Sequence, residues 1–305
     1  MEPDPSDKSL LSLRERFMRS WFPPAAVVGG IAALVVAAFR QRPVPKLAAP
    51  AAGIPAAGPL PMLQAQPAVL DWTYAPSGVV GGTQATPLFQ RSLGGIALDG
   101  GDVVYALGDG DIRIIGTDGR LVRHWPVADT AQCLTVGPDG SVYVAGAGRI
   151  DVYDGAGVRT GGFAIGDAAK AASLTAIAVV GQDIVVADAS ARIIWRADRA
   201  GRVLGRIGDQ HKTKAFILPS GTLDLAVDAS GTVHATDTGR HQVTAWALDG
   251  TPVRAFGKFG MSDPSNFVGC CNPVNVALTP DGKVVTAEKM IARVKVFEPD
   301  GRLLA

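Results

Sequence analysis

Short apolar runs separated by polar turns make up most of the chain from residue 92 onward. Five segments share one order: an apolar run, a glycine-containing turn, a second run, a short polar step, a third run and a turn of the Asp-Gly type. Apolar runs of about four to eight residues between such turns are typical of β-strands. No long segment with helical periodicity separates the runs, so helical crossovers of a parallel α/β fold are not expected. The pattern predicts an all-β domain.

The five segments are repeats of one unit. Their starts lie about 40 to 50 residues apart, the interval expected of β-propeller blades built from four short strands each. Turns of the Asp-Gly type recur among them, for example at 139–140 and 281–282. We therefore predict a β-propeller. The apolar runs that open the five repeats start at Gly95, Cys133, Ala176, Asp224 and Asn275.

The fifth repeat ends at Leu303-Leu304-Ala305, which is too short for a full outer strand. An open sheet edge invites association with other chains, so we expect another segment to complete the propeller. Two upstream segments have the composition of strands, Val69–Tyr74 and Pro87–Arg91. We expect five or six blades over residues 69–305, with Trp72 buried against the fifth repeat.

The N-terminal part has a different pattern. Residues 21–39 carry no charge, and at about 1.5 Å per residue they span a hydrocarbon core of about 30 Å. We predict a tail (1–20), a transmembrane anchor helix (21–39), a Pro/Ala-rich linker (40–68) and the propeller (69–305). A slight excess of Lys and Arg before the helix favours a cytoplasmic N-terminus. The propeller would then lie on the periplasmic or extracytoplasmic side of a bacterial inner membrane. A cleaved signal peptide is the alternative.

Two repeats carry a motif that resembles the NHL repeat, in which an acid that ends the second strand faces an arginine that opens the third. The motif stands at Asp188 to Arg192 and at Asp237 to Arg240. The stretch Gly269-Cys270-Cys271-Asn272-Pro273 is similar to a motif of a bacterial subgroup of NHL-type propellers. The resemblance covers about residues 92–305. It implies a propeller that usually continues into one more blade, and it leaves the activity open because propellers host unrelated functions.

Composition narrows the function. The net charge is +1, which gives no reason to expect a nucleic-acid partner. No Ser-His-Asp arrangement, His-Glu-x-x-His motif or phosphate loop is present, so we expect neither an enzyme nor a cofactor. The leading hypothesis is a binding scaffold or accessory subunit of a membrane complex, such as a respiratory or photosynthetic one. A channel-site hydrolase or lyase is a weaker alternative, because the inner strands offer only Asp224 and Asn275 as oxygen ligands.

The two longest connections, Asp209–Thr222 and Lys258–Val274, are expected on one face of the propeller, where long loops carry recognition. Their apolar residues suit a protein contact or a local core under the rim. These residues are Phe216, Ile217, Leu218, Phe259, Met261 and Phe267. Four arginines on the same face could receive an acidic partner or pair with nearby acids to fix turns. They are Arg149, Arg192, Arg240 and Arg293.

The adjacent Cys270 and Cys271 cannot both point into one core from a regular strand, because neighbouring side chains alternate. Three interpretations stay open. The pair packs under the rim, forms a vicinal disulfide in an oxidising compartment, or binds a soft metal with Cys133 as a third ligand. The last two make a redox-active or metal-binding propeller the alternative function. Cys133 by itself is expected to be a small apolar residue in a packed strand.

Overall fold

The computed structural model describes residues 88–166, 172–209, 215–289 and 293–305. Within these ranges the strands form five antiparallel sheets. Blade 1 contains β1 (Gly95–Leu98), β2 (Val104–Gly108), β3 (Asp111–Ile115) and β4 (Leu121–Pro126), and blade 2 contains β5 (Cys133–Val136), β6 (Val142–Gly146), β7 (Arg149–Tyr153) and β8 (Arg159–Ala164). Blade 3 contains β9 (Leu174–Val180), β10 (Asp183–Asp188), β11 (Ile193–Asp198) and β12 (Val203–Ile207). Blade 4 contains β13 (Leu225–Val227), β14 (Val233–Asp237), β15 (Gln242–Trp246) and β16 (Pro252–Phe256). Blade 5 contains β17 (Asn275–Leu278), β18 (Val284–Glu288) and β19 (Arg293–Phe297).

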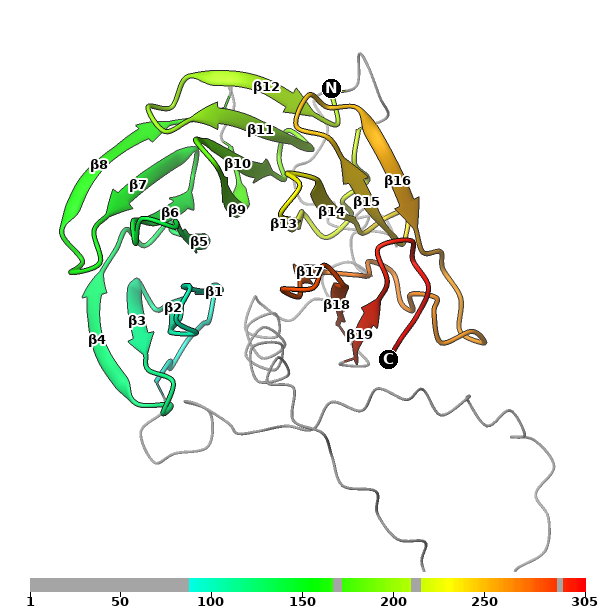
Figure 1. Ribbon diagram of the computed structural model, residues 1–305, viewed down its shortest axis with the longest axis horizontal. Coiled ribbons are helices and arrows are strands. Elements are labelled where there is room, and N and C mark those ends of the chain that lie inside the picture. Colours follow the sequence, from blue (N-terminus) through cyan, green and yellow to red (C-terminus); the bar gives the residue numbers. More distant parts are fainter. Residues whose placement is uncertain (1–87, 167–171, 210–214, 290–292) are drawn as a thin grey trace, which may run out of the picture.

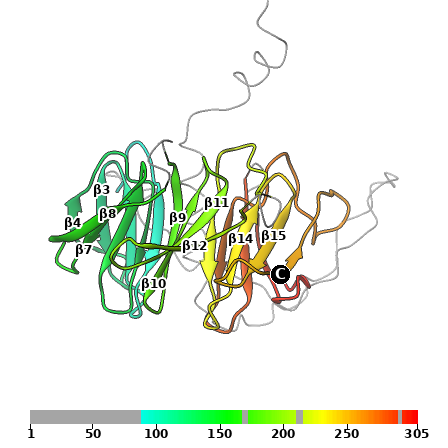
Figure 2. The same cartoon turned by 90° about the horizontal axis from the view of Figure 1, so that it is seen from above.

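The sheets are arranged radially, as Figure 1 shows. In each sheet the strands follow chain order from the centre to the perimeter, and the inner strands β1, β5, β9, β13 and β17 pack on one another in sequence. Figure 2 shows the strands running across the thickness of the disc, with the connections gathered at its two faces. This is a five-bladed β-propeller, as the repeats predicted.

Burial explains why the central runs are continuously apolar. The second strands β6, β14 and β18 are buried at every position. β6 and β14 each lie between two neighbouring blades, and β18 packs beside blade 4. Blade 1, for example, presents Tyr105, Ile112 and Ile114 to Leu134 and Val144 of blade 2. Each such buried aliphatic or aromatic side chain contributes about 1.5 to 3 kcal/mol. The outer strands are mostly exposed and therefore polar or mixed in composition.

A glycine in the turn before the outer strand lets each blade fit its predecessor. Gly157 has a φ of +88°, and a Cβ placed there would lie 2.5 Å from the ring of Trp125 in blade 1. A Cβ placed at Gly201 of blade 3 would likewise lie 2.5 Å from the ring of Phe163 in blade 2. Any side chain would collide with the aromatic ring and would also occupy the left-handed backbone region. The repeated glycine therefore sets the spacing between blades.

Blade 5 obtains its outer segment from the end of the chain. Leu303 bridges Phe297 in antiparallel fashion, and the Leu304 N–H donates to the Val296 carbonyl at 2.7 Å. The Val296 N–H in turn donates to the Ala305 carbonyl at 2.8 Å. The last residues, although short, thus cover the edge of β19.

The prediction that Pro87–Arg91 completes the fifth repeat is wrong. Its described part, residues 88–91, lies on blade 1, where Asp109 accepts the N–H groups of Gln90 at 2.6 Å and Arg91 at 3.0 Å. A carboxylate that satisfies several backbone donors holds that segment more firmly than an edge position on blade 5 would. The second candidate, Val69–Tyr74, lies outside the described residues, as do the predicted anchor helix and linker.

No helix long and apolar enough to cross a membrane occurs in the part of the chain that the structure describes.

Candidate functional site

Acidic side chains at the hairpin between the second and third strands tie the blades together. In four blades this acid accepts an N–H from the segment that leads into the same blade. The bonds run from Gln90 to Asp109 at 2.6 Å, Ser173 to Asp188 at 3.3 Å, Ile217 to Asp237 at 3.1 Å and Val268 to Glu288 at 2.8 Å. Bonds to a charged acceptor are stronger than neutral ones. Each acid therefore anchors an inter-blade connection at the loop-rich face.

Electrostatics agree with this anchoring at Asp109. Burial acts to raise the pKa of its carboxyl group, but the N–H groups of Gln90, Ser92 and Arg91 lower it, and the net shift is downward. The carboxylate is therefore charged over the ordinary pH range and holds the incoming segment.

The arginines predicted opposite these acids behave differently in different blades. Arg240 pairs with Asp237, and Arg293 pairs with Glu288 at 2.8 Å. No ion pair joins Arg192 to Asp188 among the described residues, so that predicted pairing is wrong. Asp188 instead accepts the Ser190 hydroxyl at 2.7 Å and the Trp195 indole N–H at 3.2 Å.

The fourth arginine belongs to the outer part of blade 2. Arg149 binds Asp151 at 2.8 Å, a carboxylate that it shares with Arg159. Three of the four predicted arginines thus have carboxylate partners within their own blade. The face therefore does not carry a free basic ring, and the turn-fixing interpretation holds for Arg240 and Arg293.

Three of the six predicted contact residues are part of the core. Phe216 is 2% exposed, and its ring centroid lies 5.9 Å from that of Trp246 in blade 4. Phe267 is fully buried, 5.9 Å from the ring of Phe297, and Leu218 is buried with Phe216. Partner contact is therefore wrong for Phe216, Leu218 and Phe267, because they fill the space between blades under the rim.

The other three predicted contact residues are exposed: Ile217 by 42%, Phe259 by 57% and Met261 by 81%. Ile217 lies against Gly239, and the ring of Phe259 lies 5.2 Å from that of His241. Both contacts are made on the β14–β15 hairpin of blade 4, although Ile217 and Phe259 come from different loops. We call Ile217, Phe259 and Met261 the rim patch.

His241 supports this patch as a neutral aromatic residue. Burial lowers the pKa of its imidazole more than the nearby Asn272 backbone and Glu288 raise it. Its Nδ1 atom is buried without a hydrogen-bond partner among the described residues. The uncharged ring therefore packs against Phe259 near neutral pH.

The two adjacent cysteines occupy a turn that enters blade 5. Cys270 is exposed and Cys271 is buried, both are free thiols, and their Sγ atoms lie 3.3 Å apart. Burial and the neighbouring Cys270 thiol raise the pKa of Cys271 to about 11. The turn brings both thiols together, which a regular strand would not do.

Cys133 lies apart from this pair. Its thiol is buried in the core of blades 2 and 3 and faces the Leu174 carbonyl at 3.5 Å. Burial, with a smaller effect of Asp224, raises the pKa of this thiol. Among the described residues, no three His, Cys, Asp or Glu side chains form a group that could hold a metal. Cys133 is therefore a packed strand residue, and the three-sulfur metal site is wrong.

The channel positions predicted from the alignment do come together at the inner strands. The Asp224 carboxylate accepts the Val276 N–H at 2.9 Å, the Leu225 N–H at 3.0 Å and the Asn275 amide at 3.2 Å. Burial raises the pKa of Asp224 to about 6 despite these three donors. The acid and the amide thus bind each other and join blade 4 to blade 5.

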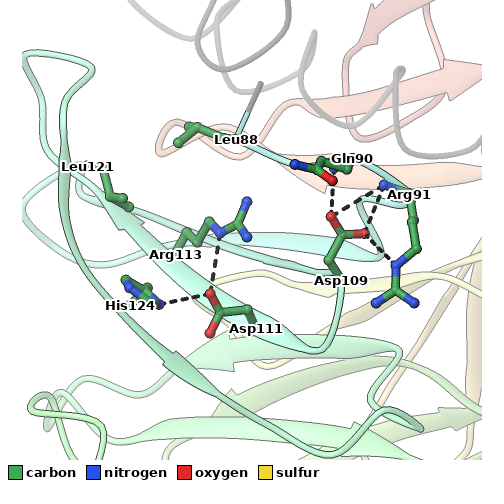
Figure 3. Close-up of a pocket in the computed structure, with 8 residues that line it drawn as sticks. All are labelled: Leu88, Gln90, Arg91, Asp109, Asp111, Arg113, Leu121 and His124. Atoms are coloured by element: carbon green, nitrogen blue, oxygen red, sulfur yellow. Dashed lines mark hydrogen bonds and ion pairs between the residues drawn. The ribbon is translucent and has the colours of Figure 1, made fainter. Parts of the chain in front are cut away.

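Sequence patterns did not predict a polar pocket on blade 1. Figure 3 shows Asp111 between Arg113, at 3.4 Å, and His124, at 2.9 Å. The Arg113 guanidinium also lies 4.5 Å from the centre of the Phe89 ring. The open cavity has a volume of approximately 500 Å³. It is lined by Leu88, Gln90, Arg91, Asp109, Asp111, Arg113, Leu121 and His124.

No known protein-family model matches the chain, and no curated protein matches it. Solved structures match its fold. A protein of unknown function from Bacteroides caccae has 12% identity and a TM-score of 0.55, with 70% of this chain and 80% of that chain covered. A streptogramin B lyase has 16% identity and a TM-score of 0.52, with 69% and 67% covered. Virginiamycin B lyase from Staphylococcus aureus has 17% identity and a TM-score of 0.49, with 69% and 68% covered. At these identities the first two likenesses show the propeller fold alone, and they say nothing of this chain's activity.

Proposed function

We propose that this chain is an NHL-type propeller that binds a protein partner through the rim patch, as a scaffold or accessory subunit of a membrane complex. The observation that carries the proposal is the exposure of Ile217, Phe259 and Met261 on neighbouring loops of one face. Aromatic residues and methionine are enriched where proteins bind one another.

The distribution of other exposed apolar residues supports this choice of surface. Val122, Val158 and Val253 are also exposed, but each lies in or next to the outer strand of a different blade. Leu121, Val203 and Leu204 are exposed on the outer strands β4 and β12 as well, so these residues are spread around the perimeter, where exposed apolar side chains are normal. In the rim patch, by contrast, two loops meet on one hairpin.

The uncharged run at residues 21–39 and the Pro/Ala-rich segment at 40–68 support membrane attachment. In this proposal the helix anchors the chain in a bacterial inner membrane and the linker holds the propeller on the extracytoplasmic side. The acid-containing hairpins and the Gly-Cys-Cys-Asn-Pro turn support the NHL assignment.

Co-purification from mild detergent tests the proposal. The full chain carries a tag after Ala305, and the comparison variant carries Ile217→Ser, Phe259→Ser and Met261→Ser. A matched control carries Val122→Ser, Val158→Ser and Val253→Ser, which removes comparable apolar surface from the perimeter. A partner identified by mass spectrometry is then purified, and its affinity for all three proteins is measured.

We expect the rim-patch variant to bind the purified partner at least about tenfold more weakly than the wild type, while the control retains its affinity. Equal thermal unfolding of the variants must accompany this result. A partner that the rim-patch variant binds as tightly as the wild type would overturn the proposed surface.

A further inference from the structure

The paired thiols of Cys270 and Cys271 are arranged for chemistry that packing alone does not require. Their Sγ atoms are 3.3 Å apart and therefore in contact without being bonded. Neighbouring Cα atoms lie only about 3.8 Å apart, closer than in most disulfides, so closing the bond of about 2.05 Å also requires the backbone of the turn to adjust. One thiol faces solvent and the other is buried. A soluble reagent therefore meets Cys270 first.

The backbone that presents these thiols is fixed by the next residue. Asn272 is fully buried, its Nδ2 donates to the Val268 carbonyl, and its Oδ1 accepts the Lys289 N–H at 2.9 Å. The amide thus connects both sides of the turn to the end of β18. Because the frame is held in this way, the two sulfurs stay close to each other.

The two thiols have different surroundings and therefore react differently. Burial holds the pKa of Cys271 at about 11, so this thiol stays protonated near neutral pH. A protonated thiol is a poor nucleophile. Cys271 therefore reacts slowly with outside reagents, but its Sγ is well placed to attack the Cys270 sulfur once that sulfur is part of a mixed disulfide.

The turn ends the loop that carries Phe259 and Met261, and it contacts both the loop that carries Ile217 and the β14–β15 hairpin on which Phe259 rests. The Ser220 side chain, from the loop that contains Ile217, lies beside the Cys271 thiol and lowers its pKa. The backbone of Asn272 lies beside the ring of His241, on which Phe259 rests. A change in the covalent state of the turn therefore reaches each loop through one side chain.

We propose that Cys270 and Cys271 form a thiol–disulfide exchange site that takes small-molecule disulfides and closes to a vicinal disulfide. The Cys270 thiolate attacks one sulfur of the reagent, the reagent's S–S bond breaks, and the first thiol leaves with the proton that Cys270 gave up. Cys271 then loses its proton and attacks the Cys270 sulfur, which breaks the mixed disulfide and releases the second thiol. Two protein thiols are oxidised, and one external disulfide is reduced to two thiols.

The exchange chemistry stands without the proposed partner. Its effect on the rim patch rests on the proposed function, because an oxidised turn shifts Ser220 and Asn272 and thereby weakens binding of the partner. The two parts are therefore measured separately.

Intact-mass spectrometry of the full chain tests the site, with glutathione disulfide as the probe. The chain is reduced, freed of reductant and incubated with the probe. We expect the wild type to lose two hydrogens and to retain no glutathione. We expect Cys271→Ser to retain one glutathionyl group, because the mixed disulfide has no resolving thiol. Cys133→Ser is the matched control and should behave like the wild type.

A wild-type chain that stays unmodified, or that keeps a glutathionyl group, overturns the site, and this result does not depend on any variant folding. The same holds if Cys133→Ser prevents the loss of two hydrogens. Binding of the identified partner to the reduced and oxidised wild type tests the coupling. Equal affinity with the disulfide formed overturns the coupling alone, whereas retention of the partner by the rim-patch variant overturns the proposed function.

Discussion

Lys295 and Glu288 form an ion pair inside blade 5, with Nζ 2.9 Å from Oε1 and side-chain exposures of 5% and 0%. The Lys295 ammonium also donates to the Asn266 carbonyl and lies 4.8 Å from the centre of the Phe267 ring. Burial lowers the pKa of Lys295 more than the pairing with Glu288 raises it. The pair therefore fixes the loop before blade 5 through the bond from Lys295 to Asn266, although burying the two charges costs desolvation energy. The charge of Lys295 is stabilised by Glu288.

Replacing Glu288 should show how much the fold depends on the ion pair with Lys295. Glu288→Gln removes the carboxylate that forms ion pairs with Lys295 and Arg293, and removal of one partner of a buried pair costs about 3 to 5 kcal/mol. The control is Glu298→Gln, which breaks an exposed pair with Arg302 and should cost no more than about 1 kcal/mol. Urea unfolding of both variants measures the difference, and equal losses would contradict the structural role of Glu288.

The raised pKa of Asp224 gives a pH dependence with a definite sign. Its value of about 6 lies above the ordinary aspartate value of 3.8, so between these pH values the folded state binds more protons than the unfolded state. Stability contributed by the protonated acid is complete below pH 3.8 and is lost as the pH rises through 6. The free energy of unfolding should fall by about 1.4 kcal/mol for each pH unit that separates the two pKa values.

Comparison with Asp224→Asn isolates this contribution. The free energy of unfolding of the variant should not decline between pH 4 and pH 6. Acids with lowered pKa values, such as Asp228 at about 2, titrate below this pH range and affect both proteins equally. Urea midpoints at several pH values check the difference between the two proteins. A difference that is constant with pH would show that Asp224 titrates normally.

Substitutions at two glycines with positive φ allow the cost of backbone strain to be measured apart from the cost of a steric collision. Gly140 has a φ of +77° and no atom within 4 Å of a Cβ, whereas Gly157 has a φ of +88° and the Trp125 ring at 2.5 Å. Gly140→Ala should cost about 1 kcal/mol for the backbone alone. Gly157→Ala should cost about 1 to 3 kcal/mol more, because the indole must move. Thermal unfolding of the two variants provides the comparison.

The proposed membrane topology has its own test. A reporter fused after Ala305 should be active only on the extracytoplasmic side, and extraction of the full chain should need detergent. Deletion of residues 1–42 should release a soluble, folded propeller, because the blade strands that the structure describes begin only at Gly95. Release of the full chain by a carbonate wash would contradict the anchor.

The sequence predicted the blades because each repeat carries its own apolar runs and turns. It also aligned Asp224 and Asn275, which the structure joins through a hydrogen bond at the inner strands. It predicted the same acid–arginine pair in two blades, and Asp237 and Arg240 form it. Asp188 binds Ser190 and Trp195 instead, because a pattern does not tell which of several donors a carboxylate reaches.

The same limit applies to the edge of blade 5 and to the pocket of blade 1. Leu303–Ala305 is too short to be recognised as a strand, yet its backbone bonds to Val296 cover the edge. Asp109 binds residues that are 17 to 19 positions upstream, and no local period marks that contact. Burial depends on three-dimensional neighbours, so the sequence also could not separate Phe216, now in the core, from the exposed Ile217 beside it.

Each described sheet is built from one continuous stretch of chain, including blade 5, whose edge is covered by the residues that directly follow it. None of the sheets that the structure describes has to wait for a strand from the opposite terminus. On a ribosome that adds about 5 to 20 residues per second, each blade can form its hydrogen bonds within seconds of its own synthesis and then serve as a template for the next. The molecule can thus assemble blade by blade in the direction of its synthesis.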